Sequence, residues 1–92
     1  MPTFDQIEDF DWLPELEEKI LVKHGVARNE VEECFFAPGY KILQGENSKY
    51  QLFSRCESGR YLLVVYVWKG KLLRIISARD MIDRERKYYR QK

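Results

Sequence analysis

The chain has 92 residues and a mass of 11.1 kDa, which fits one domain built around one hydrophobic core. Its composition is 45% hydrophobic and 34% charged with 5 Gly and 3 Pro, which argues against a disordered, collagenous or low-complexity protein. The longest apolar run, Tyr61 to Trp68, has eight residues, whereas a membrane-spanning helix needs about 20. The N-terminus is acidic, unlike a signal peptide, so we expect a soluble, cytoplasmic protein with no membrane partner.

The charges are segregated along the chain, although the net charge is only +1. Residues 1–33 carry ten acidic and three basic side chains, a net charge of −7, and residues 34–92 carry thirteen basic and five acidic ones, a net charge of +8. This separation predicts a basic surface on the second two-thirds of the chain, suited to a polyanion or an acidic partner protein. A solvated surface of mixed charge is the alternative.

The first third of the chain favours helices. Residues 1–12 are predicted to form a loosely packed lead-in. A helix is predicted from Pro14, because proline suits the first helical position and Gly25 can take the left-handed conformation that ends a helix. A second short helix is predicted from Asn29 to Phe36, with Asn29 as its cap.

The middle of the chain favours strands over Lys49 to Arg55, Arg60 to Trp68 and Leu72 to Ser77. The connections are too short for parallel crossovers, so we expect an antiparallel meander of three or four strands. The second of these strands is apolar on both of its faces, which predicts a central position with both faces covered.

A last helix is predicted from about Arg79 to Tyr89, with Ser77 as a candidate cap. The order of elements predicts a single α+β domain over residues 1–92, with two N-terminal helices, the meander and a C-terminal helix.

The two cysteines, Cys34 and Cys56, stand 22 positions apart without a CxxC motif, and we expect two reduced thiols. The signatures of nucleotide-binding, metalloprotease and serine hydrolase sites are absent. With one histidine and no ligand cluster, the sequence predicts neither a metal nor a cofactor.

The basic residues suit metal-free cleavage of RNA by its own 2′-hydroxyl. This reaction needs a proton acceptor, cations around the phosphorane and a proton for the leaving oxygen. Arg55, Arg74 and Arg79 lie on or beside predicted strands, which hold guanidinium groups rigidly. Arg74 interrupts an apolar strand, and its alternative role is a structural ion pair with Glu85 or an N-terminal acid.

The Lys23-His24 pair stands at the predicted helix end before Gly25. An imidazole suits acid–base work, whereas a cation at a helix C-terminus also stabilises the helix dipole, and the residues alone leave both roles open. Several tyrosines could stack RNA bases or belong to the core: Tyr50, Tyr61, Tyr88 and Tyr89.

Four motifs occur in order along the chain: Phe10-Asp11-Trp12, Lys23-His24-Gly25-Val26, the run from Arg74 to Arg79 (RIISAR), and Glu85-Arg86 with Tyr89 beyond it. Together they resemble the BrnT toxin family of type II toxin–antitoxin systems. The resemblance implies a RelE-like α+β fold, growth arrest by endoribonuclease cleavage of RNA, and a cognate DNA-binding antitoxin that binds the toxin.

The resemblance also implies site residues, at the positions that match the motifs: Lys23, His24, Arg55, Arg74, Arg79, Glu85 and Tyr89. We expect the three arginines to neutralise the scissile phosphate and His24 or Lys23 to move protons. Glu85 and Tyr89 are expected to support them. A further group, Lys49, Arg60 and Lys71, is expected to follow the RNA backbone.

The chain departs from the family pattern at two places. Ser48-Lys49 stands where a Glu-Arg pair begins a strand, and Ile20 replaces a polar residue. The alternative function is therefore a catalytically weakened module that binds an antitoxin or nucleic acid without cleaving it. A third hypothesis is that the basic face binds an acidic protein. A homo-oligomer or a hetero-oligomer with the antitoxin is compatible with each of them.

Overall fold

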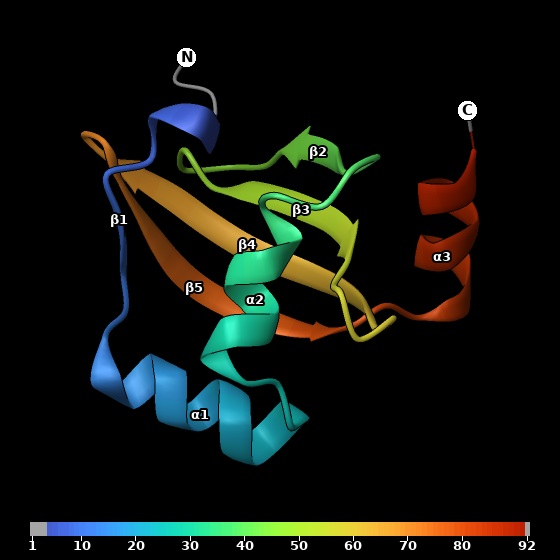
Figure 1. Ribbon diagram of the computed structural model, residues 1–92, viewed down its shortest axis with the longest axis horizontal. Helices are drawn as coiled ribbons and strands as arrows, with labels where there is room; N and C mark the ends of the chain where they lie inside the picture. The colour runs from blue at the N-terminus through green and yellow to red at the C-terminus, as the bar shows by residue number, and fades with distance from the viewer. Residues whose placement is uncertain (1–3, 92) are drawn as a thin grey trace.

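The computed structural model describes residues 4–91, with a five-stranded mixed sheet at its centre (Figure 1). The strands are β1 (Asp9–Asp11), β2 (Lys41–Gln44), β3 (Tyr50–Arg55), β4 (Tyr61–Lys69) and β5 (Leu72–Asp80). They lie in the order β1-β5-β4-β3-β2, and β1 pairs with β5 in parallel while the other pairs are antiparallel. The three strands located in the sequence correspond to β3, β4 and β5, and β2 is the fourth strand of the meander, whereas the parallel strand β1 was not predicted.

Residues 4–12 belong to the fold, although the sequence suggested a loose lead-in. Phe4–Gln6 form a short 3-10 helix, and β1 follows on the edge of the sheet. The Phe4 side chain is 7% exposed, and its ring centre lies 5.0 Å from that of Phe35 and 5.9 Å from that of Tyr66. Aromatic packing thus ties the start of the described chain to the core, and residues 1–3 lie outside the described residues.

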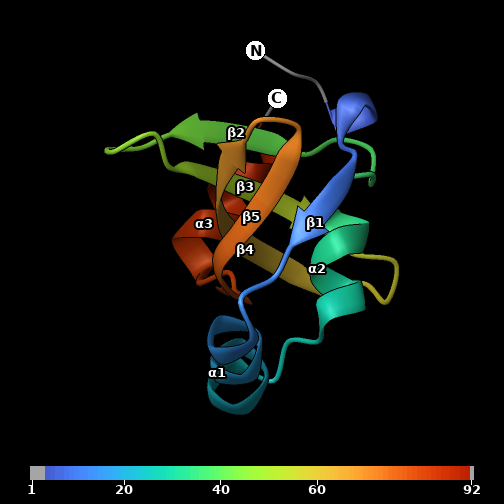
Figure 2. The same ribbon diagram turned by 90° about the vertical axis from the view of Figure 1, so that its left-hand side faces the viewer.

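The first helix, α1 (Pro14–His24), has the predicted start and end. Gly25 has φ 65° and donates its backbone N–H to the carbonyl of Leu21 at 2.9 Å, so it closes the last turn as expected. Figure 2 shows α1 below the sheet and α2 (Arg28–Cys34) beside it. The cap of α2 is Ala27 and not Asn29, because the Glu30 carboxylate accepts the Ala27 N–H at 3.0 Å.

The last helix, α3 (Asp83–Arg90), begins four residues later than predicted. Ser77 and Arg79 extend β5, where they lie opposite Val65 and Leu63 of β4. The ladder satisfies the backbone groups of these residues, so Ser77 caps no helix. The cap is Ile82, whose N–H is accepted by the Glu85 carboxylate at 2.9 Å.

The sheet is covered on both faces. On one face a core of buried side chains joins the sheet to α1 and α2, and it includes Ile20, Val31, Phe35, Leu52, Leu62, Leu73 and Ile75. On the other face Phe53, Leu63 and Met81 pack together with tyrosines of α3. Neighbouring β4 residues Leu62 and Leu63 are 0% and 3% exposed, which confirms the central position predicted for this strand.

Both cysteines are buried free thiols, as expected. Burial raises the pKa of the Cys34 thiol to about 12, so this group is protonated at neutral pH. Within residues 4–91, no helix combines the length and the apolar character that crossing a membrane requires.

We predict that Phe4→Ala lowers the free energy of unfolding by about 3 kcal/mol, because it empties a buried aromatic site. Urea denaturation of the full chain measures this change. Val22→Ala, at a position that is 78% exposed, is the control and should change stability by less than about 0.5 kcal/mol. An equally small change for Phe4→Ala would contradict the contribution of residues 4–12 to the fold.

Candidate active site

Strand register brings two of the predicted arginines to one end of the sheet. Arg55 lies opposite Tyr61 in the β3–β4 ladder, and Arg79 lies opposite Leu63 in the β4–β5 ladder. Tyr61 and Leu63 are two positions apart on β4, so these four side chains share one face. This is the face on which α3 packs.

Tyr61 is surrounded by cationic side chains at this end of the sheet. The guanidinium carbons of Arg55 and Arg86 each lie 5.3 Å from the centre of the Tyr61 ring, and that of Arg90 lies 5.6 Å away. The Tyr89 ring meets the same ring edge-on, with centres 5.9 Å apart. We call Arg55, Tyr61, Arg86, Tyr89 and Arg90 the Tyr61 cluster.

The three arginines of the Tyr61 cluster carry positive charge without a matching carboxylate. Within residues 4–91, none of them forms an ion pair with Asp or Glu. The ring offers each cation a cation–π attraction, which is weaker than a charge-assisted hydrogen bond to an anion. Arg86 also has a buried Nε with no hydrogen-bond partner among the described residues. The cluster is therefore suited to bind an anion.

Arg79 is held beside this cluster by Glu85. Its two terminal nitrogens donate to the two Glu85 oxygens at 2.8 and 2.9 Å. These bonds hold the pKa of the Glu85 carboxyl below its ordinary value, and they raise the pKa of Arg79. Burial raises the pKa of Tyr89, which keeps its hydroxyl protonated at neutral pH. The expected supporting residues thus lie at the same end of the sheet as Arg55 and Arg79.

Arg60, expected to follow the RNA backbone, is an internal bridge. It donates two hydrogen bonds of 3.0 Å to Asp80 and one of 3.2 Å to Glu30. It also donates to the backbone carbonyls of Gly25 at 2.7 Å and His24 at 3.2 Å. The guanidinium therefore joins the end of α1 to α2 and β5, and it has little capacity left for a phosphate.

His24 lies half-buried at the end of α1, and its neighbour Lys23 is exposed. His24 lines a small cavity of about 270 Å³ together with Lys19 and Ser77. The pKa of Asp80 is lowered mainly by its hydrogen bonds with Arg60, and the charges of Arg86 and His24 lower it further. Asp80 consequently lies near both His24 and the Tyr61 cluster.

Arg74 lies away from the Tyr61 cluster, near the start of β5. Its Nε donates to the Asp11 carboxylate at 2.7 Å, and the two residues are direct neighbours in the β1–β5 ladder. The alternative role of Arg74 was a structural ion pair with an N-terminal acid. Arg74 forms such an ion pair with Asp11.

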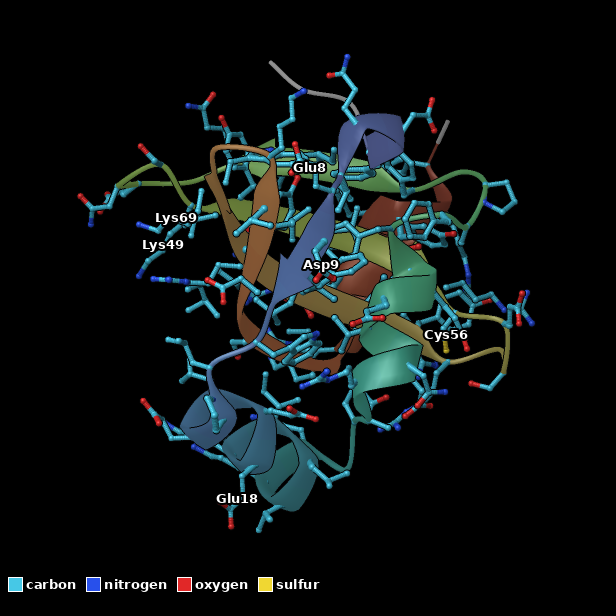
Figure 3. The ribbon with its side chains drawn as sticks, turned by 60° about the vertical axis from the view of Figure 1, so that its left-hand side comes forward. Glu8, Asp9, Glu18, Lys49, Cys56 and Lys69 are labelled. Atoms are coloured by element: carbon cyan, nitrogen blue, oxygen red, sulfur yellow. The ribbon has the colours of Figure 1, made fainter. Side chains whose placement is uncertain are left out.

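Lys49 and Lys71 are exposed at the opposite end of the sheet from Arg55. The nine residues of β4, at about 3.3 Å each, separate the two ends by roughly 25–30 Å. Figure 3 shows Lys49 and Lys69 together on one side, far from Cys56, which follows Arg55 in the chain. Ser48 lies in the turn next to Lys49, so the departure from the family pattern there does not alter the Tyr61 cluster.

The sequence interpretation did not assign roles to Arg86 and Arg90. Their spacing of four positions places both on one face of α3, but the predicted helix ended at Tyr89, one residue before Arg90. Their convergence with Arg55 on Tyr61 depends on how α3 packs, which the spacing does not reveal. In residues 4–91, no group of three or more His, Cys, Asp or Glu side chains is placed to hold a metal ion.

We predict that Arg60→Gln lowers the free energy of unfolding by about 2 kcal/mol, because it removes the guanidinium that donates to Asp80, Glu30 and two backbone carbonyls. Urea denaturation measures the loss. The matched control is Arg28→Gln, which removes an exposed ion pair with Glu17 and should have a much smaller effect. Equal losses for the two variants would show that Arg60 is an ordinary surface arginine.

We also predict a pH-dependent contribution from Glu85. Because its pKa is lower in the folded chain, Glu85 stabilises the fold above its unfolded-state pKa, and this stability is lost as pH falls through the folded-state pKa. Glu85→Gln should therefore cost about 1 kcal/mol at pH 7, and the difference from wild type should shrink toward pH 3. Denaturation at both pH values tests this. The control Glu18→Gln, at an exposed position of α1, should have little effect at either pH.

A family model described as the ribonuclease toxin BrnT of type II toxin–antitoxin systems matches residues 12–85. A similar solved structure is the 1.1 Å crystal structure of the Brucella abortus ribonuclease toxin BrnT, with a TM-score of 0.69 and 15% sequence identity. The alignment covers 82% of this chain and 97% of that one, which supports a BrnT fold in place of the broader RelE-like description. A comparison with curated protein sequences gives no significant match. Since the family model covers most of its length, the chain belongs to the BrnT family of type II ribonuclease toxins.

Proposed function

We propose that this toxin cleaves RNA internally without a metal ion, with the scissile phosphate bound at the Tyr61 cluster. Membership of the family gives the class of activity, ribonuclease, and implies an RNA substrate and an antitoxin partner. The observation that carries the proposed position is that three arginines converge on Tyr61 and none of them forms an ion pair among the described residues. Guanidinium groups that already lack a counter-ion bind a phosphodiester without first giving up an ion pair.

The reaction that suits these residues is an attack by the RNA on its own backbone. The 2′-oxygen forms a bond to phosphorus and gives its proton to a base, while the bond from phosphorus to the 5′-oxygen breaks. The leaving oxygen takes a proton from an acid, and the products are a 2′,3′-cyclic phosphate and a 5′-hydroxyl. Negative charge builds on the phosphorane oxygens, and Arg55, Arg86 and Arg90 stabilise it.

His24 is the proposed proton-transfer group, because it is an imidazole and Arg60 joins its backbone carbonyl to Asp80 at the end of β5. Lys23 lies next to it and is a second candidate. Arg79 is proposed to contact the phosphate with the part of its side chain that Glu85 leaves exposed. Arg74 is the predicted site residue that this arrangement leaves without a role at the phosphate.

The antitoxin is proposed to be a DNA-binding protein that inhibits the toxin by covering the Tyr61 cluster in a hetero-oligomer. Covering three cations with acidic groups would remove the phosphate site and satisfy the unpaired charges at once. We place the reaction in the cytoplasm, where the RNA substrate is found. Residues 1–92 are proposed to act as a single toxin domain.

We predict that Arg55→Gln or Arg90→Gln lowers the rate of RNA cleavage at least about tenfold, because each removes one cation from the phosphate site. A labelled RNA incubated with the purified chain measures the rate. Arg84→Gln makes the same chemical change at an exposed position of α3 outside the cluster, and it should keep cleavage within about threefold. If all three variants cleave like wild type, the phosphate does not bind at Tyr61.

Cleavage by the wild-type chain should continue in excess chelator and leave 2′,3′-cyclic phosphate ends, since arginines supply the positive charge in this mechanism. Loss of cleavage on chelation and its return with added Mg²⁺ would overturn metal independence. Binding of RNA without any cleaved product would favour the weakened binding module instead.

A further inference from the structure

A second feature adjoins the Tyr61 cluster: an open pocket of about 620 Å³ at the end of the β3–β4 hairpin. Its lining includes Arg55 and Tyr89, which also belong to the cluster, together with Glu33, Phe36 and Pro38. The volume is in the range of small-molecule sites, and a single nucleobase fits within it. None of the residues outside the cluster has a role in the proposed phosphate chemistry.

The pocket offers apolar rings for stacking. Phe36 is a large apolar residue and yet 60% exposed, two residues after the end of α2. Phe10 meets it edge-on, with ring centres 6.2 Å apart and an angle of 87°, which supports the ring in place. Tyr89 is supported in the same way by Tyr61. An unstacked RNA base recovers its lost stacking on rings of this kind.

The charged side chains that line the pocket are one cation, Arg55, and two carboxylates, Glu33 and Glu57. Arg55 stands where the pocket meets the cluster, so it can hold the phosphate of a nucleotide whose base enters the pocket. The carboxylate of Glu33 accepts the backbone N–H of Glu57 at 3.2 Å, which fixes its position. Glu33 repels a phosphate, but it accepts hydrogen bonds from base N–H groups.

We propose that this pocket holds one base of the RNA, from the nucleotide whose phosphate lies at the Tyr61 cluster, and that Glu33 selects guanine. Guanine presents two adjacent donors, N1–H and the N2 amino group, which match the two oxygens of one carboxylate. Adenine and cytosine present a single donor on that edge, the amino group, and uracil presents a single donor, N3–H. The inference rests on the proposed function, because it takes RNA as the ligand.

The test uses 5′-GMP and 5′-UMP as probes in NMR titrations of the isotope-labelled full chain, and sequencing of RNA ends after cleavage. We expect 5′-GMP to shift the amide signals of Phe36, Glu57 and Gly59 and to bind at least about fivefold more tightly than 5′-UMP. Cleavage sites should show a preference for guanine at one position.

Glu33→Gln keeps an oxygen for the Glu57 N–H but loses the second acceptor, so it should abolish the guanine preference while cleavage continues. Phe36→Ala should weaken binding of both nucleotides at least about fivefold. Glu46→Gln, in the exposed turn after β2, is the matched control and should leave the preference unchanged.

Equal binding of 5′-GMP and 5′-UMP, or cleavage sites that Glu33→Gln does not change, would overturn the inference. The inference would also be overturned if Phe36→Ala bound the antitoxin more weakly but bound nucleotides like the wild-type chain, because the pocket would then be a contact for a protein. Failure of the proposed function looks different: the wild-type chain would cleave no RNA, while selective binding of 5′-GMP in the pocket would persist.

Discussion

The arrangement of α1, α2 and β5 depends on the hydrogen bonds that the Arg60 guanidinium donates. It satisfies backbone carbonyls at the end of α1 and binds carboxylates on α2 and β5. Three segments that are remote in sequence thereby meet at one planar group with donors in fixed directions. The position of His24 relative to the end of β5, and hence to the Tyr61 cluster, follows from this junction.

The structure also explains part of the charge segregation along the sequence. Acidic residues of the first third pair across the fold with arginines of the remainder, as Asp11 does with Arg74 and Glu30 with Arg60. These two pairs neutralise part of the basic charge of residues 34–92. Arg55, Arg86 and Arg90 remain beside α3 without an ion pair among the described residues, so the functional signal is the distribution of counter-ions and not the total charge.

The sequence predicted elements whose signals are local. Pro14 and Gly25 delimit α1, and the apolar run of β4 indicates a central strand. It did not predict β1, because three residues carry too little periodicity and the parallel pairing depends on a partner 63 positions away. For the same reason the sequence identified Arg74 and Arg79 as candidate site residues, but it did not predict how Asp11 and Glu85 bind them. Arg86 and Arg90 required the packing of α3 before their relation to Tyr61 became visible.

Glu85 has two attachments, since its carboxylate binds Arg79 and also accepts the N–H of Ile82 at the start of α3. An anion that draws Arg79 toward itself therefore competes with the group that anchors the first turn of this helix. Occupancy of the site and order at the helix start are thermodynamically linked through a single side chain. Binding of a negatively charged ligand therefore changes the order of the first turn of α3, the helix that carries Arg86 and Arg90.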